Sequence, residues 1–133
     1  MVIIALSNEG EILVTREYRH PVGNIVFGCP GGLVDPNESI LEAAHRELKE
    51  ETGYTAKNIE IIGSCFPLPG ILNQKMHVAL ATGIEYAHTQ QLEPSENIQL
   101  FFMNKEELFN KLHNEHNIDG IFCTALFFYT HRE

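Results

Sequence analysis

Apolar and polar residues alternate along most of the N-terminal half of the chain, which predicts β-strands. The runs VIIAL and ILVTREY are rich in β-branched residues and flank the turn SNEGE, so a hairpin is expected over residues 2–18. The stretch NIVFGCPGG predicts a short strand that breaks into a Pro/Gly-rich turn at residues 28–32. Further strands are expected in NIEIIGSCF, KMHVALATGIEY and NIQLFFM.

A helical pattern replaces this alternation after residue 35. The segment DPNES carries helix-start signals, with Asp35 or Asn37 as the expected cap. The helix is expected from about Ser39 to Thr52 and should stop at Gly53, because glycine readily takes the left-handed conformation that ends a helix. The face expected to pack on the sheet holds Leu41, Ala44 and Leu48, with Ile40 at its margin.

Two more helices are expected near the C-terminus. The segment NKEELFNKLHNEH has apolar residues at Leu108, Phe109 and Leu112 with polar residues between them, the pattern of an amphipathic helix. Residues 119–129 are expected to form a third, more apolar helix. Strands mixed with separated helices predict an α/β (α+β) sandwich with a mixed β-sheet, built as a single domain over residues 1–133.

Composition narrows the classes of function. The formal charge of -9 and the pI near 5.2 argue against a nucleic acid polymer as partner, since such binding needs a basic surface. A small anionic ligand would need something to neutralise the repulsion, and a metal ion could do so. No apolar run has the length of a membrane span, and the N-terminus lacks the basic region of a signal peptide.

The three cysteines, Cys29, Cys65 and Cys123, show no metal-binding spacing. We expect them to be reduced, semi-buried thiols, as in a cytoplasmic protein. The histidines, among them His20 and His45, also show no paired spacing for a metal and are expected to be surface or structural residues.

The helix over residues 39–52 concentrates negative charge on one side. Glu47, Glu50 and Glu51 stand at i, i+3 and i+4, so their carboxylates lie beside one another. Hard cations such as Mg²⁺ and Mn²⁺ are bound by carboxylate oxygens, so these residues predict a metal site. The alternative for a run such as ELKEE taken alone is a solvated helix face.

The flanking sequence favours the metal site. Gly32, five residues, Glu38, seven residues and then RELKEETGY occupy each fixed position of the Nudix box, with Tyr54 at the final apolar place. On these residues the chain resembles a Nudix hydrolase, and the resemblance in fold extends over nearly its full length. The family hydrolyses a nucleoside diphosphate linked to another group, with catalysis that depends on positioning and on neutralised charge.

The resemblance implies a role for each box residue. Glu47, Glu50 and Glu51 would be the metal ligands, and the backbone carbonyl of Gly31 would add another. Arg46 would pair with Glu38 and hold the ligand carboxylates in position, a supporting role that metal sites commonly need. The alternative for this pair is a surface ion pair that contributes little to stability.

Stretches outside the box resemble the ADP-ribose pyrophosphatase subfamily. TREYRHPVGN, GCPGGLVDP and FPLPGILNQKMHVALA are similar to segments before and after the box in those enzymes. The implied substrate-binding residues are Arg19, Arg16, Pro69 and Gly70. The implied catalytic base, which activates water, is Glu96, with Glu93 in reserve; Glu96 could instead be a fourth metal ligand or a surface residue.

The resemblance therefore implies Mg²⁺- or Mn²⁺-dependent conversion of ADP-ribose to AMP and ribose 5-phosphate. Three alternatives stay open: another nucleotide-sugar pyrophosphatase, a sanitiser of damaged (d)NTPs, and a non-catalytic nucleotide sensor. The chain departs from the subfamily at Gly28, Asn73 and Gln74. It also begins at the predicted hairpin, whereas many relatives carry an N-terminal region that helps them dimerise, so a homodimer and selectivity for adenine are open questions.

Overall fold

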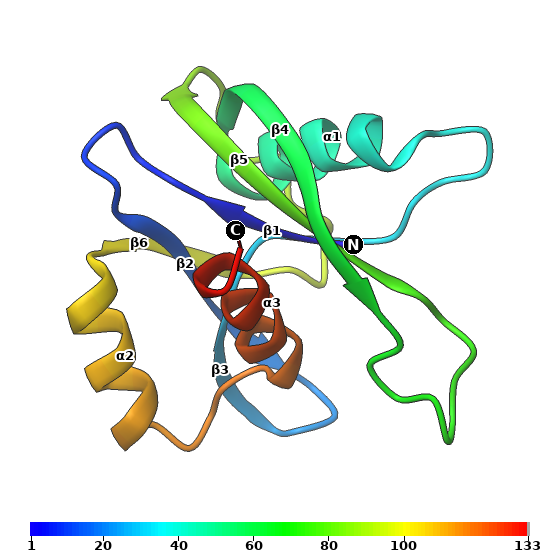
Figure 1. Ribbon diagram of the computed structural model, residues 1–133, viewed down its shortest axis with the longest axis vertical. Coiled ribbons are helices and arrows are strands. Elements are labelled where there is room, and N and C mark those ends of the chain that lie inside the picture. The colour runs from blue at the N-terminus through cyan, green and yellow to red at the C-terminus, as the bar shows by residue number, and fades with distance from the viewer. Residues whose placement is uncertain (133) are drawn as a thin grey trace.

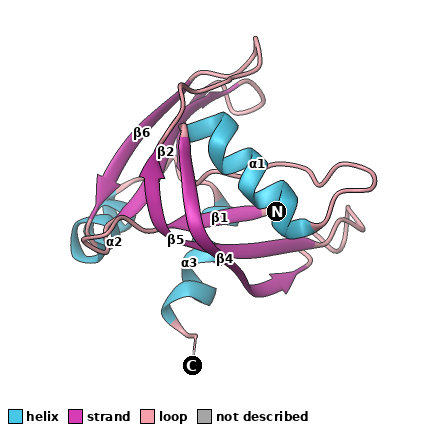
Figure 2. Cartoon of the chain, turned by 90° about the horizontal axis from the view of Figure 1, so that it is seen from above, coloured by secondary structure: helices cyan, strands magenta, loops and turns pink. Residues whose placement is uncertain are grey.

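The computed structural model describes residues 1–132 (Figures 1 and 2). Six strands and three helices follow one another along the chain. In order they are β1 (Val2–Ala5), β2 (Ile12–Arg19), β3 (Asn24–Gly28), α1 (Ile40–Thr52), β4 (Tyr54–Cys65), β5 (Met76–Tyr86), β6 (Ile98–Met103), α2 (Lys105–Asn114) and α3 (Gly120–Thr130). Among these residues no helix combines the length and the apolar character needed to cross a bilayer.

The strands form two three-stranded sheets. One has the order β1-β5-β4, with β1 parallel to β5 and β4 antiparallel to it; the other is antiparallel, with the order β3-β2-β6. Helix α1 contacts β1, β4 and β5, and α3 contacts the same three strands. Figure 2 shows the two helices on opposite sides of the first sheet. The predicted α/β sandwich with a mixed sheet is confirmed.

The predicted hairpin over residues 2–18 is wrong. Strands β1 and β2 lie in different sheets, and only an isolated bridge between Leu6 and Ile12 joins them. Strand β1 instead pairs in parallel with β5, more than seventy residues away, as in the pair Val2 and Val78. The turn SNEGE allowed local pairing, but β1 is apolar on both faces and is buried more completely between α1 and α3.

Helix α1 has the predicted bounds but a different cap. Ser39 caps it through a capping box, in which the Ser39 side chain accepts from the Glu42 N–H while the Glu42 side chain accepts from the Ser39 N–H. The predicted caps Asp35 and Asn37 lie in the preceding turn. Gly53 ends the helix as predicted, in the left-handed conformation at φ 76°.

The buried face of α1 includes Ala43 in place of the predicted Leu41. Ala43, Ala44 and Leu48 are fully buried, whereas Leu41 is 43% exposed. Leu48 packs with Ile3, Leu13 and Ala79 in one core cluster. This cluster fixes the rotation of α1 and therefore decides where its glutamates point.

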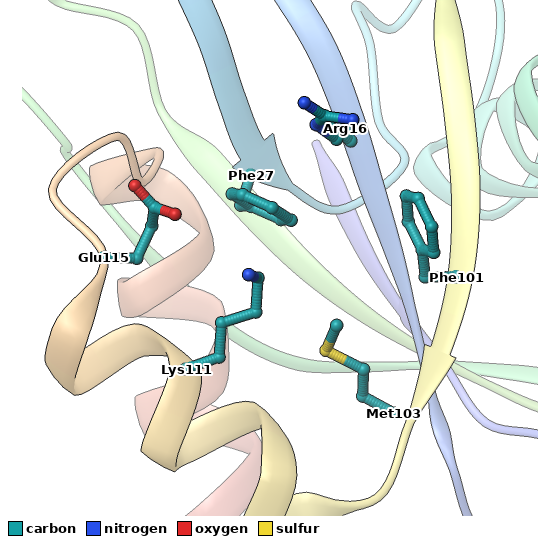
Figure 3. Close-up of a pocket in the computed structure, with 6 residues that line it drawn as sticks. All are labelled: Arg16, Phe27, Phe101, Met103, Lys111 and Glu115. Atoms are coloured by element: carbon teal, nitrogen blue, oxygen red, sulfur yellow. The ribbon is translucent and has the colours of Figure 1, made fainter.

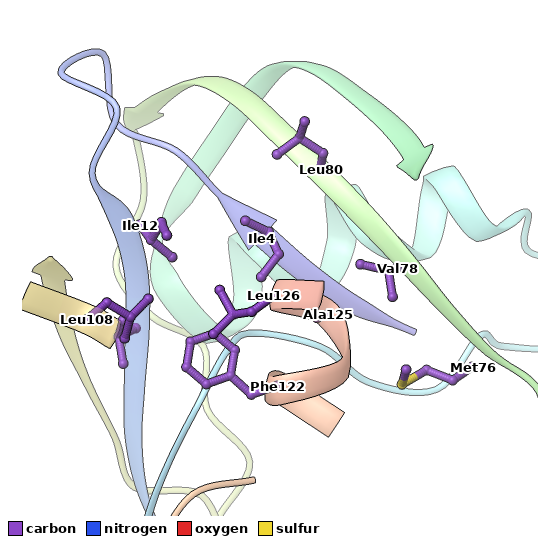
Figure 4. Packing of buried hydrophobic residues seen from close by; sticks show 10 residues of the cluster. Ile4, Ile12, Met76, Val78, Leu80, Leu108, Phe122, Ala125 and Leu126 are labelled. Atoms are coloured by element: carbon purple, nitrogen blue, oxygen red, sulfur yellow. The ribbon is translucent and has the colours of Figure 1, made fainter. Parts of the chain in front are cut away.

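A second core cluster lies on the other side of β1 and β5. Helix α3 contributes Phe122, Ala125 and Leu126, and α2 contributes Leu108, which is 1% exposed (Figure 4). These side chains pack on residues of β1, β2 and β5, namely Ile4, Ile12, Val14, Met76, Val78 and Leu80. Both predicted C-terminal helices are thereby confirmed.

Candidate active site

Arg46 on α1 lies at the centre of the acidic residues. Its Nε and Nη2 donate to the two oxygens of Glu38 at 2.8 and 2.9 Å. Its Nη1 donates to Glu47 Oε1 at 2.9 Å and to Glu50 Oε2 at 3.3 Å. The guanidinium therefore forms a bidentate pair with Glu38 and donates one hydrogen bond to each of Glu47 and Glu50, a geometry that only arginine offers.

The turn before α1 positions the Glu38 side chain for this contact. Its Oε2 accepts from the Asp35 N–H at 3.0 Å, and Arg46 Nη2 also donates to the Leu33 carbonyl at 3.0 Å. The hydrogen bond from Arg46 is the main cause that holds the pKa of Glu38 at about 2. The predicted Arg46–Glu38 pair thus forms, and it ties the 33–38 loop to the helix.

Glu51 is the most buried of the box glutamates, with 9% of the residue exposed. Its Oε2 accepts from the Gly31 N–H at 2.8 Å. Burial raises the pKa of Glu51 to about 8, and the charges of Glu47, Glu96 and Glu17 add to this rise against the opposing effect of the Gly31 hydrogen bond. The residue predicted to offer its carbonyl to a metal, Gly31, therefore lies in contact with a predicted ligand.

Glu47 lies against Gly32. A Cβ atom added to Gly32 would overlap the Glu47 carboxylate, so the absence of a side chain there makes room for it. The Glu47 side chain is only 14% exposed. Burial raises its pKa, Arg46 opposes the rise, and the charges of Glu50 and Glu96 add to it.

The loop before β6 brings Glu96 close to Glu47 and Glu51. These three residues, together with Glu50 and Glu17, are called the acidic group below. Gln90 Nε2 donates to the Glu51 carbonyl at 2.7 Å, and the Gln91 N–H donates to the Glu50 carbonyl at 2.7 Å, so the loop is fixed to the end of α1. The charge of Glu96 acts on Glu47 and Glu51. Glu93, the reserve candidate, is exposed and adds no such effect in the described residues.

The sequence did not single out Glu17, which completes the acidic group from β2. The residue is 8% exposed, and burial is the main cause that raises its pKa. The charge of Glu96 adds to the rise, and so does that of Asp119, the cap of α3. The sequence did offer an indication of this position. Alternate residues of a strand lie on the same face, so Glu17 lies on the face of β2 that carries the buried Leu13 and Thr15.

Arg19 extends the site along β2. Its Nη2 lies 3.1 Å from Glu17 Oε2, and its side chain is 52% exposed. It also lines a pocket of about 390 Å³ between the β2–β3 turn and the segment 116–120. Of the predicted substrate-binding residues, Arg19 thus lies beside the Glu17 carboxylate with half of its side chain exposed.

Three predicted substrate-binding residues do not join this group. Arg16 points to the opposite face of the β3-β2-β6 sheet, where its Nη1 donates to Gln99 Oε1 at 3.3 Å. Pro69 and Gly70 are exposed in the loop between β4 and β5, which Figure 1 shows at the lower right, apart from α1. The base of that loop comes closer, because Gln74 and Lys75 line a pocket with Leu33 and Val34.

The residues of the acidic group suit a hard cation in the chemistry of their side chains. In residues 1–132, no three acidic, histidine or cysteine side chains already converge as metal ligands. The reason is that Glu47 and Glu50 turn toward Arg46 and Glu51 toward Gly31. Their donors are carboxylate oxygens, and the pKa values of Glu47 and Glu51 are raised mainly by burial and further by the neighbouring carboxylates. Carboxylate oxygens of this kind would suit a hard divalent cation.

Comparison with known proteins agrees with this geometry. The model of the NUDIX domain family matches residues 1–123. The chain is 29% identical over 108 residues to an ADP-ribose pyrophosphatase of Bacillus subtilis, covering 80% of this chain and 58% of that protein. It is 38% identical over 96 residues to an ADP-ribose pyrophosphatase of Saccharomyces cerevisiae, covering 68% of this chain and 42% of that protein. The chain thus spans about half the length of these two relatives.

Solved structures give the same result for the fold. The crystal structure of an ADP compounds hydrolase superposes with a TM-score of 0.86 at 25% identity, over 97% of this chain and 69% of that one. A MutT NUDIX hydrolase from Burkholderia pseudomallei shares the fold, with a TM-score of 0.69 at 22% identity over 93% of this chain and 92% of that one. The chain therefore belongs to the NUDIX domain family, and it resembles the ADP-ribose pyrophosphatases within it.

Proposed function

We propose that this protein hydrolyses the pyrophosphate bond of a nucleoside diphosphate linked to a sugar, with ADP-ribose as the first candidate and AMP and ribose 5-phosphate as products. One observation carries the proposal: Arg46 grips Glu38 and at the same time orders Glu47 and Glu50 beside the buried Glu51. The named ADP-ribose pyrophosphatases that the chain resembles give the substrate class.

The acidic group needs positive charge before it can accept a pyrophosphate. Glu47, Glu50 and Glu51 would hold Mg²⁺ or Mn²⁺, with the Gly31 carbonyl as a further ligand. The bound cation would neutralise the pyrophosphate oxygens and so lower the barrier to attack by water. Arg46 would keep Glu47 and Glu50 in position through its anchor on Glu38.

Two residues outside α1 complete the proposed chemistry. Glu96 accepts the proton of the attacking water while the water oxygen forms a bond to one phosphorus. The bond from that phosphorus to the bridging oxygen breaks, and the bridging oxygen leaves as part of a phosphate monoester. Arg19, half exposed beside Glu17, donates to a phosphate or ribose oxygen and holds the substrate across the carboxylates.

The test is a coupled assay with purified protein. ADP-ribose and other NDP-sugars are incubated with Mg²⁺, with Mn²⁺ or with EDTA; the protein is then removed by filtration, divalent cations are restored in excess, and alkaline phosphatase is added. Turnover of 8-oxo-dGTP, whose terminal phosphates the phosphatase attacks directly, is followed by chromatography without phosphatase. The phosphatase releases phosphate from the monoesters AMP and ribose 5-phosphate but not from the intact pyrophosphate. Phosphate release from ADP-ribose that EDTA abolishes is expected, with products identified by chromatography.

The matched control is Glu50→Gln, which keeps the size of the side chain and removes one carboxylate. We expect this variant to lose at least about tenfold in rate, because a lost charged ligand removes transition-state stabilisation. Phosphate release no higher than that of Glu50→Gln across the whole panel would refute the proposal. Tight binding of ADP-ribose by calorimetry with no product would instead support a sensor, and faster turnover of 8-oxo-dGTP than of ADP-ribose would favour a sanitiser.

A further inference from the structure

Arg16 belongs to a second pocket, on the back of the β3-β2-β6 sheet. Arg16 and Glu17 are neighbours in β2, so their side chains point to opposite faces, with Glu17 at the acidic group and Arg16 away from it. The pocket has a volume of about 360 Å³, within the range of roughly 300–1,000 Å³ usual for small-molecule sites. Its lining residues are Arg16, Phe27, Phe101, Met103, Lys111 and Glu115 (Figure 3).

Two cations and one carboxylate line this pocket, and neither cation forms a direct ion pair in the described residues. Arg16 and Lys111 lack such a pair although the chain has twice as many acidic as basic residues, 18 against 9. Lys111 Nζ lies 4.4 Å from the centre of the Phe27 ring. Figure 3 shows it beneath that ring, with Arg16 on the other side. The pocket is therefore a positive spot on an acidic protein.

Three further lining residues, Phe27, Phe101 and Met103, are apolar. Phe101 is 39% exposed, and Phe27 and Met103 are half-buried beside it. Arg16 continues into a smaller adjoining pocket of about 80 Å³ with Tyr18 and Ile25. Aromatic rings at the edge of such a surface stack readily on a planar base.

The one carboxylate in the pocket, that of Glu115, is held by the backbone. Its Oε1 accepts from the N–H groups of His116 and Asn117 at 3.0 and 3.1 Å. These bonds, with a smaller effect of Lys111, lower the pKa of Glu115. In the described part of the chain its Oε2 makes no hydrogen bond, which leaves it for a ribose hydroxyl or an exocyclic amine.

We propose that this pocket binds a nucleoside monophosphate, at a site separate from the acidic group. Arg16 and Lys111 bind the phosphate, the rings of Phe27 and Phe101 contact the base, and Glu115 accepts from the ribose. The two cations select an anion, and the aromatic lining selects one that carries a planar ring. The strongly negative chain excludes a nucleic acid polymer from the same surface.

Methionine NMR can locate the binding directly. The protein is labelled with ¹³C at the methionine methyl groups, the Met103 signal is assigned with Met103→Leu, and AMP is added in EDTA so that no hydrolysis occurs. We expect the Met103 signal to shift in a saturable way, while the signal of Met76, buried in the core, stays in place. Adenosine should bind at least about tenfold more weakly, because it lacks the charge that the cations recognise.

A second experiment replaces both cations and tests whether they bind the phosphate. Arg16→Gln with Lys111→Gln should weaken the AMP-dependent shift of Met103 at least about tenfold. Lys105→Gln is the matched control, since Lys105 is an exposed cation on the same helix that does not line the pocket, and it should leave the affinity unchanged.

Three results would overturn this site. They are no Met103 shift at millimolar AMP, an equal shift with inorganic phosphate alone, and an affinity that the double substitution does not change. None of them depends on hydrolysis, because every titration is run without a divalent cation. These titrations therefore test the AMP site independently of the proposed hydrolysis of ADP-ribose.

Discussion

Replacement of Glu51 by Gln should stabilise the metal-free protein at alkaline pH. The substitution keeps the shape of the side chain and keeps an oxygen that can accept from the Gly31 N–H. It removes a carboxylate that is 9% exposed and lies in the field of Glu47, Glu96 and Glu17. An ionised group so placed destabilises the folded chain, because water solvates it better in the unfolded state.

The magnitude follows from the pKa of Glu51, which folding raises from 4.5 to about 8. Between these two values the folded protein keeps a proton that the unfolded chain has released, so stability falls as pH rises through this window. Each pH unit removes about 1.4 kcal/mol, which gives a ceiling of about 5 kcal/mol above pH 8. The advantage of Glu51→Gln should therefore be near zero at pH 4.5 and reach about 2–5 kcal/mol at pH 8.5.

Urea unfolding in EDTA at pH 5 and at pH 8.5 measures this difference. With Mg²⁺ at 100 times its dissociation constant, the wild type should gain about 2.7 kcal/mol and the variant much less. The reasoning is refuted if Glu51→Gln is less stable than the wild type at pH 8.5 in EDTA. It is also refuted if the difference between the two proteins is the same at both pH values.

Three further substitutions address other parts of the site and the core. Gly32→Ala places a methyl group where the Glu47 carboxylate lies, so hydrolysis should fall at least about tenfold with a small change in stability; coupled assays and urea unfolding report the two effects. Leu48→Ala empties a fully buried position and should lower the free energy of unfolding by about 2–5 kcal/mol in urea titrations. Glu96→Gln should lower kcat by about 10²–10⁴-fold, whereas Glu93→Gln should leave it within about twofold; equal losses in steady-state assays would remove Glu96 as the base.

The parts of the fold that the sequence predicted are those governed by local chemistry. Helix α1 ends at Gly53 because the left-handed cap suits glycine, and its apolar repeat predicted the burial of Ala44 and Leu48 but not the exposure of Leu41. The cap at Ser39 was also readable as the pair Ser39 and Glu42 of a capping box, but the nearby Asp35 competed for the same role. The strand that pairs with β1 could not be predicted from the sequence. Its parallel pairing with β5 is set by burial between two helices and not by the adjacent turn.

The alternation of side chains along β2 separates two arginines that were both predicted to bind substrate. Arg16 and Arg19 are three positions apart in β2, so they belong to opposite faces of the sheet. Only the face of Arg19 also carries Glu17 and reaches the acidic group. The face of Glu17 could be predicted from its place in the strand, but its approach to Glu96 and Asp119 could not, because these residues come from distant segments of the chain.

Arg46 is placed so that it can release two carboxylates without losing its own position. It binds Glu38 through Nε and Nη2, while Glu47 and Glu50 share Nη1 alone. A cation that draws Glu47 and Glu50 away therefore breaks the weaker contacts and leaves the bidentate pair with Glu38 intact. The same residue would then supply positive charge before a cation binds and rigidity afterwards, which accounts for three glutamates, Glu38, Glu47 and Glu50, around a single arginine.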